Sequence, residues 1–99
     1  MKDVNTFSDE AKRSAGHQLG LVQAGFEPLD WKSMETVGAG VKEIRIRVEA
    51  LYRVLYVAKF SEAVYVLHAF VKKTQKTSKK DIDLSAERYK ALIRARNAK

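Results

Sequence analysis

The chain has 99 residues, of which 45% are hydrophobic and 9% aromatic, so it can form one folded domain over residues 1–99 and is too apolar for a disordered chain. It contains no cysteine, which excludes disulfide frameworks, thiolate zinc sites and cysteine nucleophiles. The net charge of +7 is unevenly distributed: residues 51–99 hold 12 Lys/Arg and 4 Asp/Glu (+8), whereas residues 1–50 hold 7 Lys/Arg and 8 Asp/Glu (−1). Such a distribution is typical of proteins that bind nucleic acids or other anions. Solubility alone would also account for it.

The first predicted element is a helix over residues 6–24. Thr6 or Ser8 can cap it, and acidic residues follow in its first turn. Its apolar stripe consists of Phe7, Ala11, Ala15, Leu19 and Val22. Gly25 is typical of the residue that ends a helix. Residues 26–40 are predicted to form a loop, because they contain the only proline, the only tryptophan and two of the five glycines.

Three strands are predicted next. Residues 41–49 alternate, with one apolar face and one charged face. The two faces carry Ile44, Ile46 and Val48 on one side and Glu43, Arg45, Arg47 and Glu49 on the other. Residues 51–60 are nearly all apolar and indicate a central strand, and residues 64–71 are rich in β-branched and aromatic side chains. The short links between them predict an antiparallel three-stranded meander.

A basic loop connects the meander to a second helix over residues 79–96. The loop carries Lys72, Lys73, Lys76, Lys79 and Lys80. Ser78 and Asp81 form a capping box at the start of the helix. Its apolar side consists of Ile82, Ala86, Tyr89 and Ile93. Strands grouped between two terminal helices indicate an α+β fold, and we expect both helices to pack on the face that carries Ile44 and Ile46.

Basic and aromatic side chains gather on the predicted strands. Arg45 and Arg47 share one face of the first strand, and His68 and Phe70 share one face of the third. Cations bind phosphates and aromatic rings stack on bases, so this combination suits RNA. A solvated polar face is the alternative for each residue taken alone. His68 also suits proton transfer, with a packed, hydrogen-bonded histidine as the alternative.

Arg53 lies within an apolar strand, where a charge without a partner is very costly. It must therefore belong to a functional site or pair with a carboxylate. Glu43, Glu49 and Glu62 are the candidate partners. The two histidines are far apart in the sequence, and no catalytic carboxylate pair or phosphate-binding glycine loop is present, so we expect no metal site and no cofactor.

Several runs of the sequence, taken in order, resemble the phage-derived branch of the RelE/HigB-like toxins of toxin–antitoxin pairs. They are EIR at residues 43–45, YRVLY at 52–56, LHAFVKK at 67–73, and the segment from DID at 81–83 to Arg88. The resemblance spans nearly the whole chain and is strongest over residues 41–88. It implies a RelE-like fold that lacks the family's first strand, and a metal-independent endoribonuclease that cleaves messenger RNA on the ribosome.

The resemblance also implies roles for individual residues. Arg45, Arg53 and Lys73 match basic catalytic positions, where they would clamp a phosphate and stabilise the transition state. His68 is an acid–base candidate. The other expected RNA-binding residues are Arg47, Phe70, Lys72 and Lys76. The expected partner is an antitoxin, in this branch often a small helix-turn-helix protein.

Two functions remain open on the sequence alone. The first is the ribosome-dependent toxin, and the second is a non-catalytic relative that binds RNA, the ribosome or a partner protein. The N-terminal residues lack an apolar secretory core and no segment is long enough to span a membrane, so we expect a cytoplasmic protein with no membrane association. An open sheet edge left by the missing strand makes a homo-oligomer or strand addition by a partner a further expectation.

Overall fold

The computed structural model describes residues 7–48, 50–60, 62–72 and 77–98. In this part of the chain, helix α2 (Asp9–Gln23) precedes a four-stranded antiparallel sheet, and helix α3 (Lys79–Asn97) follows it. The strands lie in chain order across the sheet: β1 (Trp31–Ser33), β2 (Val41–Arg47), β3 (Leu51–Val57) and β4 (Tyr65–Lys72). The predicted α+β class is therefore confirmed. The expected lack of a strand before the first helix concerns residues 1–6, which lie outside the described residues.

Local sequence signals set the ends of α2. The Ser8 hydroxyl caps the helix by accepting a hydrogen bond of 3.2 Å from the amide of Ala11. Asp9 and Glu10 occupy the first turn, where the helix dipole favours acidic side chains. Gly25 follows the helix with a φ of 91°, a conformation that glycine adopts at little cost. The helix predicted over residues 6–24 is thus present, with slightly tighter bounds.

The prediction of three strands is wrong by one. Residues 31–33 lie in the segment that we expected to be a loop, and they pair antiparallel with β2, with Trp31 opposite Ile44 and Ser33 opposite Lys42. The ammonium group of Lys42 lies 4.3 Å from the centroid of the Trp31 ring. The strand is too short to show an alternating pattern, and it forms because β2 offers an edge on which it can pair.

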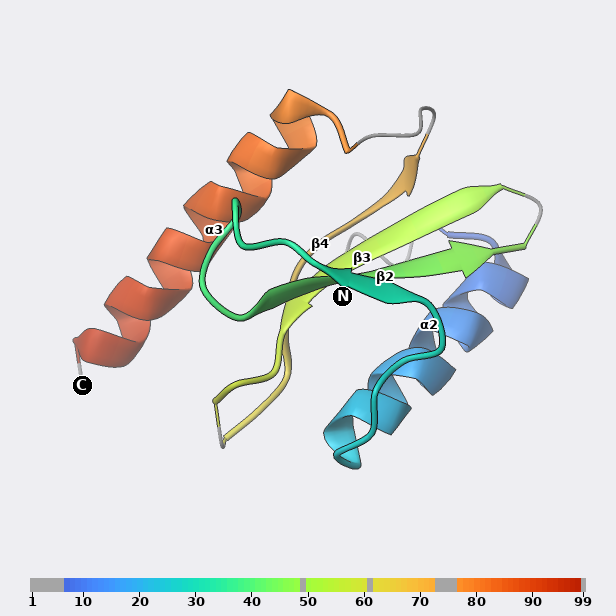
Figure 1. Cartoon of the computed structure of the whole chain (residues 1–99), viewed down its shortest axis with the longest axis horizontal. Coiled ribbons are helices and arrows are strands. Elements are labelled where there is room, and N and C mark those ends of the chain that lie inside the picture. The colour runs from blue at the N-terminus through green and yellow to red at the C-terminus, as the bar shows by residue number, and fades with distance from the viewer. Residues whose placement is uncertain (1–6, 49, 61, 73–76, 99) are drawn as a thin grey trace.

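The two helices cover opposite faces of the sheet (Figure 1), so the expectation that both would pack on the Ile44 and Ile46 face is wrong. Helix α2 packs on that face. Its core contains Phe7, Ala11, Ala15, Ile44, Ile46, Tyr52, Val54, Tyr56 and Ala69. Helix α3 packs on the other face. The core there contains Met34, Val37, Val41, Leu55, Val57 and Leu67, against which Ile82, Tyr89 and Leu92 of α3 pack.

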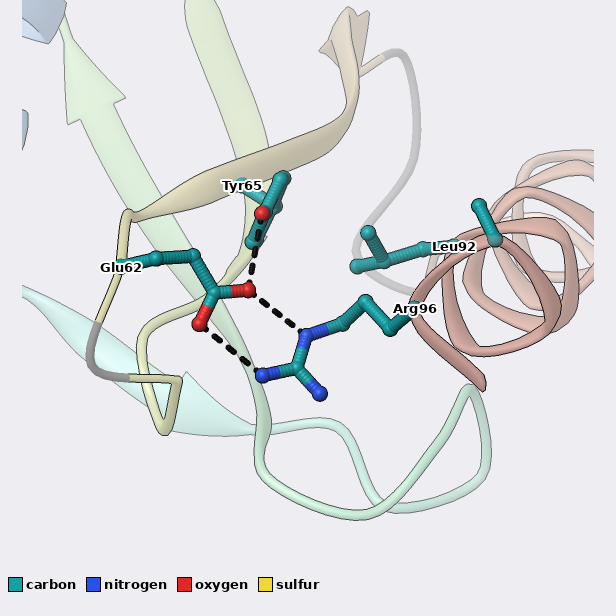
Figure 2. Close-up of a pocket in the computed structure, with 5 residues that line it drawn as sticks. Glu62, Tyr65, Leu92 and Arg96 are labelled. Atoms are coloured by element: carbon teal, nitrogen blue, oxygen red, sulfur yellow. Dashed lines mark hydrogen bonds and ion pairs between the residues drawn. The ribbon is translucent and has the colours of Figure 1, made fainter. Parts of the chain in front are cut away.

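The C-terminal end of α3 is fastened to the connection between β3 and β4 (Figure 2). Arg96 donates hydrogen bonds of 2.7 and 2.9 Å to the two carboxylate oxygens of Glu62, and the Tyr65 hydroxyl donates a third of 2.9 Å. The hydrogen bonds from Arg96 lower the pKa of Glu62 to about 2. These side chains line a surface pocket of about 470 Å³ that contains none of the expected site residues.

In the described part of the chain, neither helix has the length and apolar composition that crossing a membrane requires.

Candidate nucleic-acid interface

The strand register brings the expected site residues into neighbouring rows on one face of the sheet. Arg45 of β2 lies opposite Arg53 of β3, which lies opposite Phe70 of β4. Residues paired in this way have Cβ atoms about 5 Å apart. In the next row Arg47 lies opposite Leu51, which lies opposite Lys72. We call the side of these strands that carries Arg45, Arg47, Arg53 and Phe70 the arginine face.

Helix α3 leaves the two arginines of β2 partly uncovered. It packs on the apolar residues of the same side of the sheet, among them Leu55 and Val57 at the far half of β3. The side chains of Arg45 and Arg47 keep 27% and 73% of their surface exposed. On this side of the sheet a ligand can therefore reach Arg45 and Arg47 of β2.

Arg45 and Arg47 share one carboxylate, that of Asp30. Asp30 Oδ1 lies 3.1 Å from Arg45 Nη2, and Asp30 Oδ2 lies 3.7 Å from Arg47 Nε. The backbone carbonyl of Asp30 also accepts a hydrogen bond of 2.9 Å from the amide of Arg45. Two guanidinium groups held on one carboxylate are spaced as a bridging anion needs them.

Arg53 pairs with Glu43, one of the three carboxylates expected as its partner. Arg53 Nη1 donates to Glu43 Oε1, and the Thr77 hydroxyl donates a hydrogen bond of 2.7 Å to Glu43 Oε2. Lys32 Nζ lies 3.9 Å from the same carboxylate. The arginine and glutamate side chains are only 3% and 0% exposed. Arg53 therefore lies beneath the arginine face rather than on its surface.

His68 is buried and bound at the N-terminal end of α3. Its Nε2 lies 2.8 Å from Asp81 Oδ1, and its ring stacks on the Phe70 ring with centroids 4.6 Å apart. Partial burial alone would raise the pKa of Asp81, but hydrogen bonds with Ser78 and His68 outweigh it and lower that pKa. A carboxylate that holds one imidazole nitrogen fixes the orientation of the ring, as in acid–base sites, and equally anchors a helix to a strand.

The expected lysines lie at the end of β4 or beyond it. Lys72 is the last residue of that strand, whereas Lys73 and Lys76 lie outside the described residues. Thr77, the first described residue after them, donates a hydrogen bond to buried Glu43 and so lies next to the Arg53–Glu43 pair. Among the described residues, no three His, Cys, Asp or Glu side chains gather where they could hold a metal ion.

Sequence reasoning missed three contacts of this surface. Asp30 was assigned to a loop, and nothing in the local pattern indicated that it would reach Arg45 and Arg47. Asp81 was recognised as a helix-capping residue, yet the same carboxylate also binds His68. Nothing in the sequence indicated that Thr77 would contact Glu43. Each contact joins residues far apart in the chain, and only the pairing of the strands and the position of α3 bring them together.

Comparison with known proteins gives one match. A family model described as "Phage derived protein Gp49-like (DUF891)" matches residues 2–90. This range includes α2, all four described strands and every residue of the arginine face. No curated protein and no solved structure matches the chain.

Proposed function

Because the chain belongs to the Gp49-like family of phage-derived proteins, a family of RelE/HigB-like toxin type that is associated with toxin–antitoxin pairs, we propose that it is the toxin of a type II pair and cleaves messenger RNA on the ribosome. The observation that carries the proposal is the arginine face. Arg45 and Arg47 project from β2 and keep exposed surface, and Phe70 of β4 lies in the row of Arg45, on the other side of Arg53. Cations that hold phosphates beside a ring that can stack on a base suit single-stranded RNA.

The proposed reaction is an internal transesterification. The ribose 2′-oxygen forms a bond to the adjacent phosphorus, and the bond from phosphorus to the 5′-oxygen breaks. The 2′-hydroxyl loses its proton to a base, and the 5′-oxygen gains one. The products are a 2′,3′-cyclic phosphate and a 5′-hydroxyl. Negative charge on the non-bridging phosphate oxygens rises in the transition state, and each well-placed donor contributes about 3–4 kcal/mol to its stabilisation.

We assign the residues of this chain as follows. Arg45 and Lys73 bind the reacting phosphate, and His68 accepts the proton of the 2′-hydroxyl and returns it to the leaving 5′-oxygen. Arg47, Phe70, Lys72 and Lys76 hold the flanking RNA. Arg53 is a positioning residue, since it is almost fully buried and acts through Glu43. The reaction needs no metal, because cations of the protein supply the charge, and the ribosome supplies the orientation of the RNA.

The expected partner is an antitoxin that neutralises the toxin by covering the arginine face. An acidic or amphipathic segment fits this surface, because carboxylates bind guanidinium groups well and Arg47 is largely exposed. A helix-turn-helix protein that carries such a segment would also link toxin binding to repression of its own operon.

One observation favours the second function, a non-catalytic protein that binds RNA, the ribosome or a partner. Arg45, Arg47 and Arg53 each contact a carboxylate of this same chain. Such pairing is as suitable for a stable binding surface as for a reaction site. The two functions differ in what the protein does to a growing bacterium.

Induced expression in a bacterium tests the proposal. The toxin should arrest growth, and Arg45→Ala should abolish the arrest without reducing the amount of folded protein. Arg13→Ala is the control, because Arg13 is an exposed arginine on α2, which covers the opposite face of the sheet; this variant should still arrest growth. Harmless expression of the unaltered protein would instead support the binding protein.

A further inference from the structure

Asp30 lies between the partly exposed Arg45 and the exposed Arg47 of β2, in the position of a bridging anion. Its two carboxylate oxygens contact different guanidinium groups, at 3.1 Å from Arg45 and 3.7 Å from Arg47. A phosphodiester has two non-bridging oxygens and can bridge two guanidinium groups in the same way. The carboxylate therefore stands where an RNA phosphate would bind.

Asp30 satisfies the two arginines incompletely. Arg45 Nε is buried and has no hydrogen-bond partner among the described residues, because the carboxylate contacts only Nη2 of that group. The contact with Arg47 is longer than a hydrogen bond. Asp30 is also 40% exposed, and partly exposed ion pairs contribute little to stability. A better anion can displace it at low cost.

The backbone, rather than the ion pairs, holds Asp30 in place. Asp30 directly precedes β1, and its carbonyl accepts a hydrogen bond of 2.9 Å from the Arg45 amide, which continues the ladder between β1 and β2. Replacing the carboxylate by an amide leaves this ladder intact. The side chain can therefore be changed without moving the strand that carries it.

We propose that Arg45 and Arg47 form a phosphodiester-binding site and that Asp30 is its built-in competitor, which an RNA phosphate must displace. The identification of the ligand as RNA rests on the proposed function. RNA is favoured over an acidic peptide because Phe70 lies in the row of Arg45, beyond Arg53, and the partly exposed ring, which stacks on His68, can also contact a base. Asp30 thereby lowers the affinity of the protein for RNA that the ribosome does not hold in place.

The test measures binding of a short, fluorescently labelled 2′-O-methyl oligouridylate at low salt by fluorescence polarisation. The methyl group blocks the attacking oxygen, so binding is measured without cleavage. Asp30→Asn should bind about three- to tenfold more tightly than the unaltered protein, because the competing charge is gone. The slope of log K against log salt should steepen by about 0.7, the value for one more phosphate contact to a single strand.

Glu27→Gln is the matched control. It makes the same change in net charge and also removes a carboxylate from a cation, since Glu27 lies 3.3 Å from Lys42. Lys42 is on the opposite face of β2 from Arg45, so this variant should gain less than Asp30→Asn. A gain in Asp30→Asn no larger than that of Glu27→Gln would overturn the proposal. The proposal would also be overturned if Asp30→Asn increased the affinity equally in a protein in which Arg45 and Arg47 are both alanine.

The same variants separate this inference from the proposed function. Cleavage is measured independently on programmed ribosomes. Tighter binding by Asp30→Asn in a protein that never cleaves would support the competitor and refute the nuclease. If the protein cleaves RNA but Asp30→Asn binds the oligonucleotide no more tightly, the nuclease would be supported and the competitor refuted.

Discussion

The carboxylate of Glu43 is buried, and its contacts determine how substitutions of Arg53 should be interpreted. It is held by Arg53 and by the Thr77 hydroxyl, with no exposed surface. Removing Arg53 leaves a buried carboxylate that only the Thr77 hydroxyl and Lys32, at 3.9 Å, still contact. We expect Arg53→Ala to lower the free energy of unfolding by about 3–5 kcal/mol, measured by urea denaturation with circular dichroism.

The paired substitution Glu43→Leu with Arg53→Met is the control for that loss. It removes both charges and retains volume, so it should recover most of the stability, as apolar replacements of buried ion pairs often do. Loss of toxicity in Arg53→Ala alone is therefore no measure of catalysis. A loss of less than about 1 kcal/mol in the single variant would contradict the buried pair.

The contact of Asp81 with His68 gives stability a dependence on pH. The folded-state pKa of Asp81 is lowered: burial opposes this, but the hydrogen bonds with Ser78 and His68 prevail. Ionised Asp81 thus stabilises the fold above its unfolded pKa of about 4, and this contribution is lost as the pH falls through the lower folded pKa. The melting temperature should fall more steeply below pH 5 in the unaltered protein than in Asp81→Asn. Parallel pH profiles for the two proteins would contradict the contact.

Elements with strong local patterns were predictable, and those that depend on pairing were not. The cap and acidic first turn of α2 and the alternation along β2 are local signals, and the structure follows them. Strand β1 has three residues and no alternation, so only its partner β2 makes it a strand. The sequence also could not predict which face of the sheet α3 covers, because β3 carries apolar residues on both faces.

The connection between β1 and β2 depends on a close contact with α3 at Gly38. A Cβ atom there would lie 2.5 Å from the ring of Tyr89, whose hydroxyl donates a hydrogen bond of 2.9 Å to the carbonyl of Ala39. Gly38→Ala must displace this ring, and we expect a destabilisation of about 1–3 kcal/mol. Chemical denaturation measures it.

Gly16→Ala is the matched control for that substitution. A Cβ atom at Gly16 meets no atom within 4 Å, and the residue is in the interior of α2. Alanine favours helix over glycine, so this variant should be more stable by about 0.5–1 kcal/mol. Equal effects of the two substitutions would show that Tyr89 does not hold the connection.

Over the whole molecule, the folded chain combines charges that the sequence keeps apart. The first half of the chain is nearly neutral and the second strongly positive. In the fold, Glu43 of the first half pairs with Arg53 of the second half, and Asp30 contacts Arg45 and Arg47, which lie 15 and 17 positions further along the same half. The net charge indicated an anion-binding protein, and the alternation of β2 placed Arg45 and Arg47 on one face. Neither feature indicated that Asp30 and Glu43 of the same chain already pair with these arginines.

Cleavage of messenger RNA on programmed ribosomes tests the central claim most directly. The purified protein is incubated with ribosomes that hold a defined codon, and the ends of the products are mapped. We predict 2′,3′-cyclic phosphate or 3′-phosphate ends and 5′-hydroxyl ends, with loss of at least tenfold in rate in Arg45→Ala and none in Arg13→Ala. No cleavage by the unaltered protein, or an unchanged rate in Arg45→Ala, would contradict the arginine face as the reaction site.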